Sequence, residues 1–409
     1  MDKRIWIINY YTASPEKVSN PRYLKFAKFF MERGYDVVTF NASRSERIEI
    51  LKGKYVQKQY GPYQFVHVFA PSYVGNGIKR MFSIHQFARN VFSIRNNFEK
   101  PDVILHNIHP PFDYPIVRLA KKLKAKYIAE AWDLWPADFV KFGLIKEHNP
   151  AMKLAYAIEK QYYCHADRII FTFKGGLEYL KKKGWTKKTG GKIDMQHVHY
   201  INNGVDLKQF DRDVLKYPRQ DADINARNIY KIIYLGSIRK ANNVQALIDA
   251  ATILKDNPKY QFFIYGNGIY REYLEQYVKD NHINNVIFKE KRIPLAECAW
   301  VVSQATVNVM NYEKNFGWMG VSSGKLFQYL AAGKPIVCNI KIAYDDVITD
   351  NNLGVARELG SPEEFAAEIQ RIAELPEKDY ESMCKRVREC AEQFDYKILA
   401  AKELSILER

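Results

Sequence analysis

The sequence predicts an α/β protein with two doubly wound, Rossmann-like lobes, each a parallel sheet covered by helices on both faces. Two observations predict this class. Short, nearly continuous apolar runs alternate with stretches of helical periodicity, and the whole pattern occurs twice along the 409 residues. Strands buried on both faces have such continuous runs, and their alternation with helices is typical of parallel sheets. A chain of this length can also form two separate cores.

The first lobe is expected over residues 1–205. Its apolar runs predict strands at 4–10, 36–40, 102–106, 125–131 and 167–173, and helical periodicity predicts helices at 21–33 and 113–124. Residues 206–229 follow as the expected hinge, because the stretch 211–229 is polar and contains few large apolar side chains.

The second lobe is expected over residues 230–390. Its predicted strands lie at 230–237, 260–268, 285–290, 305–311 and 334–339, with helices at 244–256 and 270–280 among them. In the last segment, 391–409, an amphipathic pattern predicts a helix that crosses back to the first lobe. Ligands of doubly wound sheets bind at the carboxyl ends of the strands, so we expect the site in the cleft between the lobes.

The positive charge is concentrated in the first half of the chain. The net charge is +16, and residues 1–200 contain 34 Lys and Arg against 17 Asp and Glu, whereas the remainder contains 28 against 29. This asymmetry favours an anionic partner for the first lobe, either nucleic acid or lipid headgroups. Residues 78–98 combine large apolar side chains with Lys79, Arg80, Arg89 and Arg95, a pattern that fits an interfacial helix and a core helix about equally well.

The cysteine spacing and the hydropathy indicate in which cellular compartment the protein is expected. The five cysteines are scattered, without metal-ligand or disulfide spacing, which suits a reduced compartment such as the cytosol. No apolar run approaches the roughly 20 residues of a membrane span, and a strand pattern begins at residue 4, so we expect neither a span nor a signal peptide.

Three loops that follow predicted strands of the second lobe carry glycines and cations. They are 235–243 with Gly236, 265–268 with Gly266 and Gly268, and 317–325, which ends at Lys325. Backbone amides, small residues and the cations Arg239, Lys240 and Lys325 predict a diphosphate site. The two glycines of the second loop also match part of a dinucleotide fingerprint, but Tyr270 or Arg271 occupies the place of its third small residue, so NAD is a weak alternative.

Five motifs, taken in this order, resemble the retaining glycosyltransferases of family 4, which have the two-lobed GT-B fold. The motifs are "HNIHPPFDYP" (106–115), "EAWDLWPADFVKFGLI" (130–145), "YINNGVDLKQF" (200–210), "LGSIRKANNVQALIDAA" (235–251) and "KLFQYLAAGKPIV" (325–337). The second motif is similar to a segment of a subgroup that builds surface polysaccharides and O-antigens, including N-acetylfucosamine transferases. The resemblance covers nearly the whole chain.

The resemblance implies a donor site in the second lobe, made of Gly236, Arg239, Lys240, Gly266, Asn267, Ile293, Gly320, Val321, Ser322, Ser323, Lys325 and Gln328. The family carries two glutamates eight positions apart, and by register they fall on Gly320 and Gln328. Gln328 can keep part of the hydrogen bonding without the charge. We expect the donor sugar to be recognised by backbone amides of residues 319–323 instead of a carboxylate.

The catalytic candidates are Arg239, Lys240, His109 and Asp133. The two cations would neutralise the departing diphosphate. Asp133 either orients or deprotonates an acceptor hydroxyl or only caps a loop, and His109 either faces the donor sugar or is a plain loop residue. Further acceptor-side candidates are Tyr11, Arg22 and Glu130. We expect no metal and no cofactor, because the Asp-x-Asp sequences at 211–213 and 221–223 lie in the hinge and not at a strand end.

The resemblance implies transfer of a sugar, expected to be an N-acetylated or deoxy amino sugar, from a nucleoside-diphosphate donor such as UDP-sugar to a polyprenyl-diphosphate-linked acceptor. We expect the enzyme in the cytoplasm, bound through its first lobe to the anionic inner face of the cell membrane. The alternatives are a nucleotide-sugar-binding protein with an altered site, motivated by Gly320 and Gln328, and an epimerase of the same fold. Charge alone suggests nucleic acid, but no segment resembles a nucleic-acid module, so we expect no such partner.

Overall fold

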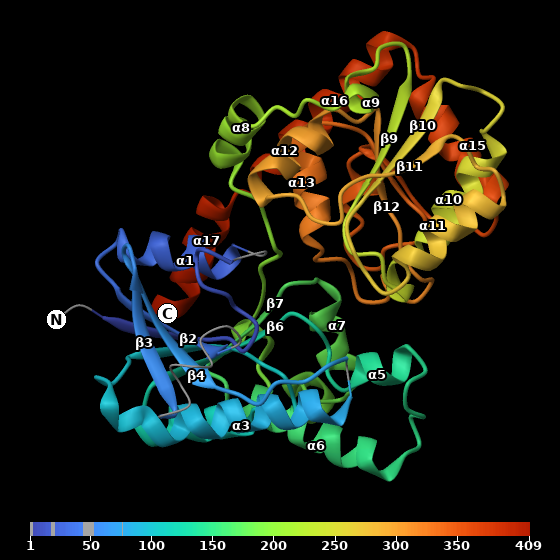
Figure 1. Cartoon of the computed structure of the whole chain (residues 1–409). Coiled ribbons are helices and arrows are strands. Elements are labelled where there is room, and N and C mark those ends of the chain that lie inside the picture. The colour runs from blue at the N-terminus through green and yellow to red at the C-terminus, as the bar shows by residue number, and fades with distance from the viewer. Residues whose placement is uncertain (1–2, 18–20, 44–52, 76) are drawn as a thin grey trace. The chain divides into compact units, whose positions relative to one another are not determined.

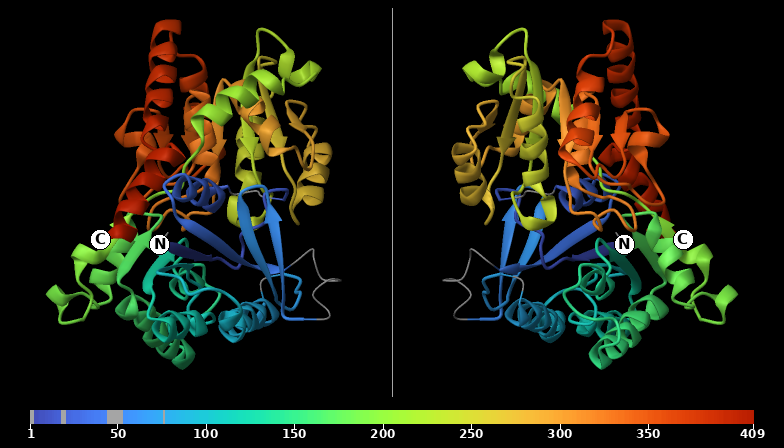
Figure 2. Two further views of the ribbon diagram at one scale, coloured as in Figure 1. Left: turned by 90° about the vertical axis from the view of Figure 1, so that its left-hand side faces the viewer. Right: turned by 90° about the vertical axis from the view of Figure 1, so that its right-hand side faces the viewer.

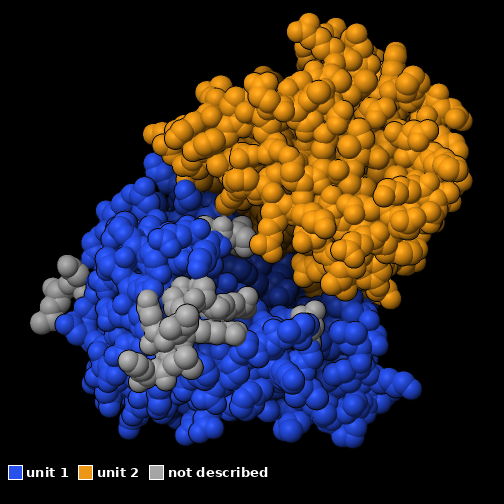
Figure 3. All heavy atoms as spheres, in the orientation of Figure 1, with its two compact units in different colours: residues 1–202, 396–409 blue, residues 203–395 orange. Residues whose placement is uncertain are grey.

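The computed structural model describes residues 3–17, 21–43, 53–75 and 77–409. The chain divides into two compact units, shown in two colours in Figure 3. Unit 1 contains residues 1–202 and 396–409, and unit 2 contains residues 203–395. Each unit is an α/β sandwich built on its own sheet (Figure 1).

The described residues of unit 1 form an eight-stranded sheet with the order β3-β4-β2-β1-β5-β6-β7-β8. The central strands are buried along nearly their whole length, as their apolar runs predict. The strands are β1 (Arg4–Ile8), β2 (Asp36–Ser43), β3 (Tyr55–Tyr60), β4 (Tyr63–Phe69), β5 (Val103–Asn107), β6 (Lys126–Ala131), β7 (Arg168–Phe171) and β8 (Val198–Tyr200).

One edge of this sheet differs from the all-parallel prediction. Strands β3 and β4 form a hairpin in which the two strands are antiparallel, while β4 continues in parallel with β2. The two strands are joined at Gly61, which has a φ of +56° and so favours a tight turn. An antiparallel strand at the edge of a parallel sheet is common in large sheets.

Helices cover both faces of the sheet of unit 1. They are α1 (Arg22–Met31), α3 (Ile78–Ile94), α4 (Tyr114–Leu123), α5 (Ala137–Lys141), α6 (Pro150–His165), α7 (Gly175–Lys182) and α17 (Tyr396–Glu408). The last of these confirms that the end of the chain forms a helix. Figures 1 and 2 show α17 beside α1, and side chains such as Leu399 and Leu404 pack into the same core as Phe26 and Phe30.

The apolar stretch in α3 is only partly available to solvent. Ile84, Phe87 and Val91 are buried in the core of unit 1. By contrast, the side chains of Ile78 and Phe82 in the first turns are 82% and 57% exposed. Of the two alternatives for this segment, the core helix therefore holds for most of α3, because its middle packs against α4 and β4.

Unit 2 has a six-stranded, fully parallel sheet with the order β11-β10-β9-β12-β13-β14 in the described residues. Its strands are β9 (Tyr230–Leu235), β10 (Tyr260–Tyr265), β11 (Val286–Phe288), β12 (Val307–Met310), β13 (Ile336–Cys338) and β14 (Gly354–Ala356). Its helices are α8 (Leu207–Lys216), α9 (Ala222–Asn225), α10 (Val244–Ile253), α11 (Arg271–Asp280), α12 (Leu295–Ser303), α13 (Gly324–Ala332), α14 (Val347–Asp350), α15 (Pro362–Ala373) and α16 (Glu377–Glu392).

Two apolar cores lie on opposite faces of this sheet (Figure 1). Side chains of α10, α11 and α15 fill one face, and those of α12, α13 and α16 fill the other. A doubly wound sheet needs both cores, because its strands are apolar on both sides.

The predicted hinge at 206–229 is part of unit 2. It contains α8 and α9, and α8 packs against α12 through the buried side chain of Phe210. Lys289 Nζ lies 2.8 Å from Asp221 and 2.7 Å from Asp223, so these carboxylates are ion-paired within unit 2. Packing and ion pairs therefore make this segment an integral part of the unit, despite its polar composition.

The helices have one further property that bears on location. Throughout the described ranges, we find no helix with both the length and the apolar character that a bilayer crossing requires.

Candidate functional site

The sheet of unit 2 has a topological switch at its centre. From β9 the chain proceeds to β10 and β11 on one side, and it then returns to β12 on the other side of β9. The connections after β9 and β12 therefore leave in opposite directions. In open α/β sheets, this arrangement makes the carboxyl ends of the two strands the usual place for a ligand. The three glycine loops predicted from the sequence follow β9, β10 and β12.

The loops after β9 and β10 touch each other through their backbones. Gly266 has a φ of +114°, and a Cβ at this position would lie 1.6 Å from the carbonyl oxygen of Gly236. Only glycine fits there. The backbone amide of Ile238 also donates to the carbonyl of Asn267 at 2.9 Å, which holds the two loops together.

Lys325, in the first turn of α13, lies against the loop after β9. Its Nζ donates to the hydroxyl of Tyr234 at 3.2 Å, and a Cβ on Gly236 would lie 3.0 Å from the same Nζ. Burial lowers the pKa of Lys325 to about 7, and the charge of Arg239 acts in the same direction. Within the described part of the chain, no carboxylate forms a salt bridge with Lys325. A half-buried cation without an acidic partner at a helix N-terminus is suited to an anionic ligand.

The loop after β12 is fixed to its neighbours. The backbone amide of Glu313 donates to the carbonyl of Ala241 at 3.0 Å, which joins this loop to the one after β9. The hydroxyl of Tyr329 on α13 accepts a hydrogen bond from the amide of Leu235 at 2.9 Å. The three loops and α13 therefore form one connected structure at the carboxyl edge of the sheet.

The other predicted donor cations are available for a ligand. Arg239 and Lys240 are exposed, and Arg239 Nε donates to Ser237 Oγ at 3.0 Å. Neither cation has an acidic partner among the residues whose positions are described. The structure thus brings Gly236, Arg239 and Lys325 close together, with Lys240 next in the chain.

Several predicted donor residues lie at the same edge. Asn267 is exposed after β10, and Ser322 and Ser323 are half-buried just before α13. Gln328 is half-buried and follows Lys325 by three residues on α13, so the two side chains share a helix face.

Two predicted donor side chains are turned into the core. Val321 is only 5% exposed and packs in the apolar cluster that also contains Leu326. Ile293 packs against a second apolar cluster, which contains Ile233 and Trp300. The side chain of Val321 is therefore buried, whereas that of Ile293 is only partly covered by its cluster.

Gly320 explains one departure from the family pattern. Its φ is +109°, a conformation that residues with a side chain rarely adopt, and its amide donates to the carbonyl of Gly317 at 3.2 Å. A glutamate at this position would be strained in the observed loop. The expected set of amides at 319–323 is also reduced by one, because the amide of Gly320 is already used within the loop.

Unit 1 has its own switch point, between β1 and β5. The chain goes from β1 to β2 on one side and later enters β5 on the other side of β1. Tyr11 follows β1 and His109 follows β5, and their rings meet at 5.0 Å in an edge-to-face arrangement. The ring of Trp135 contacts His109 in the same way at 5.4 Å. Tyr11 and His109, each predicted as a site residue of the first lobe, are thus brought together at this switch point.

Asp133 and Arg80 belong to the same cluster. Arg80 Nε donates to the Tyr11 hydroxyl at 2.7 Å, and its guanidinium lies 4.9 Å from the centre of the Trp135 ring. The side chain of Asp133 is reached by solvent. The protein packed around it raises the pKa of Asp133, while the charges of His109 and Arg80 lower it. This arrangement combines a carboxylate and a histidine that follow strands with a cation from the first turn of α3.

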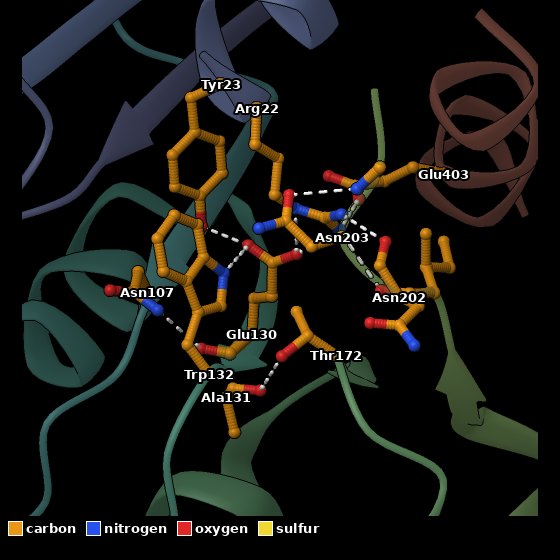
Figure 4. A network of polar contacts seen from close by, with 12 residues as sticks. Arg22, Tyr23, Asn107, Glu130, Ala131, Trp132, Thr172, Asn202, Asn203 and Glu403 are labelled. Atoms are coloured by element: carbon orange, nitrogen blue, oxygen red, sulfur yellow. Dashed lines mark hydrogen bonds and ion pairs between the residues drawn. The ribbon is translucent and has the colours of Figure 1, made fainter. Parts of the chain in front are cut away.

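Arg22 and Glu130, predicted as acceptor-side residues, are instead completely buried (Figure 4). Arg22 Nη2 donates to Glu130 at 2.6 Å and to Glu403 of α17 at 3.1 Å. Tyr23 and Trp132 donate to the second oxygen of Glu130. These residues join α1, β6 and α17, and their burial gives them a structural role and not contact with an acceptor.

Sequence reasoning missed the buried residues that support His109. Asp113 lies four residues after His109 and is in contact with it and with His106. Two histidines and an aspartate within eight residues, after a predicted strand, are the signal that could have identified this cluster.

The two doubly wound units define the GT-B fold, the architecture of a large class of glycosyltransferases. Within unit 2, residues 229–374 match the model of the family described as "Glycosyl transferases group 1". The glycine loops and Lys325 of unit 2 lie inside the matched range.

Known proteins resemble the chain over most of its length. The probable glycosyltransferase WbjE of Pseudomonas aeruginosa is 21% identical over 313 residues, which cover 74% of this chain and 73% of WbjE. The crystal structure of WaaG, a glycosyltransferase involved in lipopolysaccharide biosynthesis, superposes with a TM-score of 0.69 at 14% identity and covers 98% of this chain and 99% of WaaG. Anabaena Alr3699/HepE, solved with UDP and glucose, has a TM-score of 0.69 at 13% identity, with 99% of each chain covered.

Proposed function

We propose that the chain is a retaining glycosyltransferase of family 4 that transfers a sugar from a UDP-sugar to a lipid-linked sugar acceptor in surface-polysaccharide synthesis. The observation that carries this proposal is the site at the switch point of unit 2. There, Lys325 and Arg239 lie beside two backbones that approach each other at Gly236 and Gly266. Such a site suits a diphosphate, and it lies within the matched glycosyltransferase domain.

The proposed chemistry is an exchange of one glycosidic bond for another. The bond between the anomeric carbon and the diphosphate oxygen breaks, and a new bond forms to the acceptor hydroxyl oxygen on the same face. The departing phosphate takes the hydroxyl proton, so no protein nucleophile is needed. Arg239, Lys240 and Lys325 stabilise the negative charge that develops on the diphosphate. The reaction as proposed uses neither a metal nor another cofactor.

The proposal also specifies the nucleotide and the sugar of the donor. HepE was solved with UDP and glucose, which supports a nucleotide-sugar as donor here. We propose UDP as the nucleotide and an N-acetylated or deoxy amino sugar as the transferred group, on the resemblance of residues 130–145 to the N-acetylfucosamine transferase subgroup. Gln328, on the face of Lys325, would hydrogen-bond the nucleotide.

The acceptor is proposed to be a polyprenyl-diphosphate-linked sugar that unit 1 takes from the inner face of the cell membrane. Support comes from the basic character of residues 1–200 and from the exposed side chains of Val74, Ile78 and Phe82 around the start of α3. Apolar side chains beside cations such as Lys79 are typical of surfaces that insert into an anionic interface. His109 and Asp133 would face the acceptor and donor sugars.

A nucleotide-binding assay tests the donor site directly. We would measure thermal shifts with UDP, GDP, ADP and CMP, without metal and with EDTA. The comparison is between the wild type and a variant carrying Arg239→Ala and Lys325→Ala. Selective stabilisation by UDP in the wild type, lost in this variant, is the expected result.

The matched control carries Lys231→Ala and Lys334→Ala. This control also removes two positive charges from unit 2, but at the amino ends of β9 and β13. It should still bind UDP. Absence of stabilisation by every nucleotide would favour a binding protein with an altered site, which the missing carboxylates at Gly320 and Gln328 motivate.

A further inference from the structure

Asp113 is a buried carboxylate surrounded by hydrogen-bond donors. Its Oδ2 lies 3.0 Å from His106 Nε2 and 3.0 Å from His109 Nδ1. The backbone amide of His109 donates to the same carboxylate, at 2.8 Å to Oδ2 and 3.0 Å to Oδ1. The side chain of Asp113 is only 2% exposed. It stands at the N-cap position of α4 but makes no capping bond to that helix, because its oxygens are turned to the histidines.

The charge of Asp113 follows from these contacts. Burial alone would raise the pKa of this carboxyl group, but His106 and His109 together hold it well below its usual range. Asp113 is therefore ionised near neutral pH and can only accept hydrogen bonds. Each histidine nitrogen that faces it must consequently carry a proton.

His106 completes the inner half of the arrangement. Its Nδ1 lies 2.9 Å from the hydroxyl of Tyr127, which can donate to it, while its Nε2–H donates to Asp113. His106 is 1% exposed, and Tyr127 is buried as well. These two residues support Asp113 from the interior of unit 1 and have no access to a substrate.

His109 is the outer member, just after the carboxyl end of β5, and like Asp113 it is buried, with 4% of its surface exposed. Because its Nδ1–H donates to Asp113, its Nε2 lies on the side of the ring away from the carboxylate. The rings of Tyr11 and Trp135 flank the imidazole, and the charges of Arg80 and His109 both act on the solvent-exposed Asp133. In a neutral imidazole with a protonated Nδ1, Nε2 is a hydrogen-bond acceptor.

We propose that Asp113 is a positioning residue that holds His109 in the Nδ1–H tautomer, so that His109 Nε2 accepts a hydrogen bond from a sugar hydroxyl bound at unit 1. The role assigned to the sugar rests on the proposed function, whereas the tautomer depends only on the geometry. A carboxylate that orients a histidine through one ring nitrogen leaves the other nitrogen available for chemistry.

The tautomer can be measured without any substrate. In a two-dimensional ¹H–¹⁵N NMR spectrum of the ¹⁵N-histidine-labelled full chain, His109 is assigned by the signals that disappear in His109→Gln. We expect the wild type to show a protonated Nδ1 and an unprotonated Nε2 at a pH where the ring is neutral. A wild-type His109 that is protonated at Nε2, or an even mixture of the two tautomers, would overturn the proposal.

Asp113→Asn tests the cause of that tautomer. Its amide retains the shape but adds an N–H donor that competes for Nδ1, so the Nδ1–H population of His109 should fall. Asp138→Asn is the matched control. Asp138 Oδ2 accepts a hydrogen bond from the Leu134 amide at 2.9 Å, at the start of α5. If Asp113→Asn left the tautomer unchanged, Asp113 would not be the positioning group. If Asp113→Asn failed to fold, the wild-type spectrum would still show whether His109 is protonated at Nδ1.

Turnover and nucleotide binding separate this proposal from the proposed function. UDP binding to Asp113→Asn should match the wild type, while sugar transfer to a lipid-linked acceptor should fall roughly 10²-fold, as for the loss of a positioned histidine. If no nucleotide bound the wild type, the proposed function would be contradicted, but the proposal for the His109 tautomer would stand. If Asp113→Asn had an altered tautomer but full turnover, the proposed hydrogen bond from a sugar hydroxyl to His109 Nε2 would be contradicted.

Discussion

At the scale of single residues, Lys325 couples ligand binding to protonation. Its pKa is lowered to about 7 by burial, so a substantial fraction of the free protein carries a neutral lysine at physiological pH. A bound diphosphate stabilises the charged form and raises this pKa in the complex. Above pH 7, binding must therefore take up a proton, and the affinity must fall as the pH rises.

The first prediction follows from that linkage. Between pH 7.5 and 9, where the phosphates of UDP are fully ionised, the dissociation constant of UDP should increase by up to about tenfold per pH unit. Calorimetry in two buffers of different ionisation enthalpy measures the proton uptake. Lys325→Met should bind weakly and without this uptake, whereas Lys334→Met serves as the control and should behave as the wild type. An affinity independent of pH in the wild type would contradict the prediction.

The residue scale is also where sequence reasoning was least reliable. That Lys325, Arg239 and the glycines lie together at one edge of the sheet could be predicted, because each stands in a local pattern after a strand. Arg22 and Glu130 could not be placed, since their burial depends on Glu403, which lies 381 positions from Arg22 in the chain. A single sequence does not reveal such a distant partner.

At the scale of elements, the contact of α1 with α17 depends on one cation and two carboxylates. Burial, and next the charge of Glu130, raise the pKa of Glu403 well above its ordinary value. This shift favours the protonated form of Glu403, and Glu130 is the carboxylate nearer to Arg22, at 2.6 Å against 3.1 Å.

The second prediction compares two substitutions in this network. Arg22→Met leaves Glu130 buried without a cation and should lower the free energy of unfolding by about 3–5 kcal/mol. Glu403→Gln has the shape of the protonated carboxyl group that burial favours and should change it by less than about 1 kcal/mol. Urea unfolding at pH 7 measures both changes, and a larger loss for Glu403→Gln than for Arg22→Met would refute the assignment of charges.

The same pair gives a pH dependence. Because the folded-state pKa of Glu403 is raised, its contribution to stability is complete below about pH 4.5 and is lost as the pH rises toward the folded-state value. In Glu403→Gln, the free energy of unfolding should lack this decrease with rising pH.

The third prediction concerns the start of α3. Ile78→Ser with Phe82→Ser removes two exposed apolar side chains and should weaken binding to anionic liposomes by roughly tenfold or more, since each buries apolar area in the interface. Flotation at low salt measures the bound fraction. Leu215→Ser, at an 83% exposed position of α8 in unit 2, is the control. Equal binding of wild type and double variant would remove α3 from the membrane proposal.

Elements with strong periodicity were predicted well, and weakly patterned ones were not. The buried runs of β1, β5, β9 and β12 identify strands because they are apolar on both sides. The hairpin of β3 and β4 was missed since Gln57, Lys58 and Gln59 interrupt its apolar pattern, although the turn at Gly61 was a usable signal. The segment of α8 was taken for a hinge because only one of its faces, that of Phe210, is apolar.

At the scale of the whole molecule, the two units are built differently along the chain. Unit 2 is one continuous segment, 203–395, whereas unit 1 is closed by α17 from the end of the chain. Leu399, Leu404, Ile406 and Leu407 of α17 are all less than 9% exposed in the core of unit 1. Each such side chain contributes roughly 1.5–3 kcal/mol when buried. Together they amount to much of the 5–15 kcal/mol by which domains are stable.

The fourth prediction is that a chain ending at residue 395 keeps a folded unit 2 and loses a stable unit 1. Limited proteolysis should digest residues 1–202 and leave a fragment near 203–395 that still binds UDP. A deletion of residues 403–409 alone should have a smaller effect, because Leu399 would still cover the core. Equal protease resistance of both units in the chain ending at 395 would contradict this prediction.

The return of α17 to unit 1 also determines the order in which the protein can mature during translation. The ribosome makes most of unit 1 first, yet the apolar face beneath α17 stays uncovered until all 193 residues of 203–395 have been added. At about 5–20 residues per second this interval is roughly 10–40 s. For that time the nascent chain exposes Phe26 and its neighbours to solvent, so the half that is synthesised first is the half that most needs a chaperone.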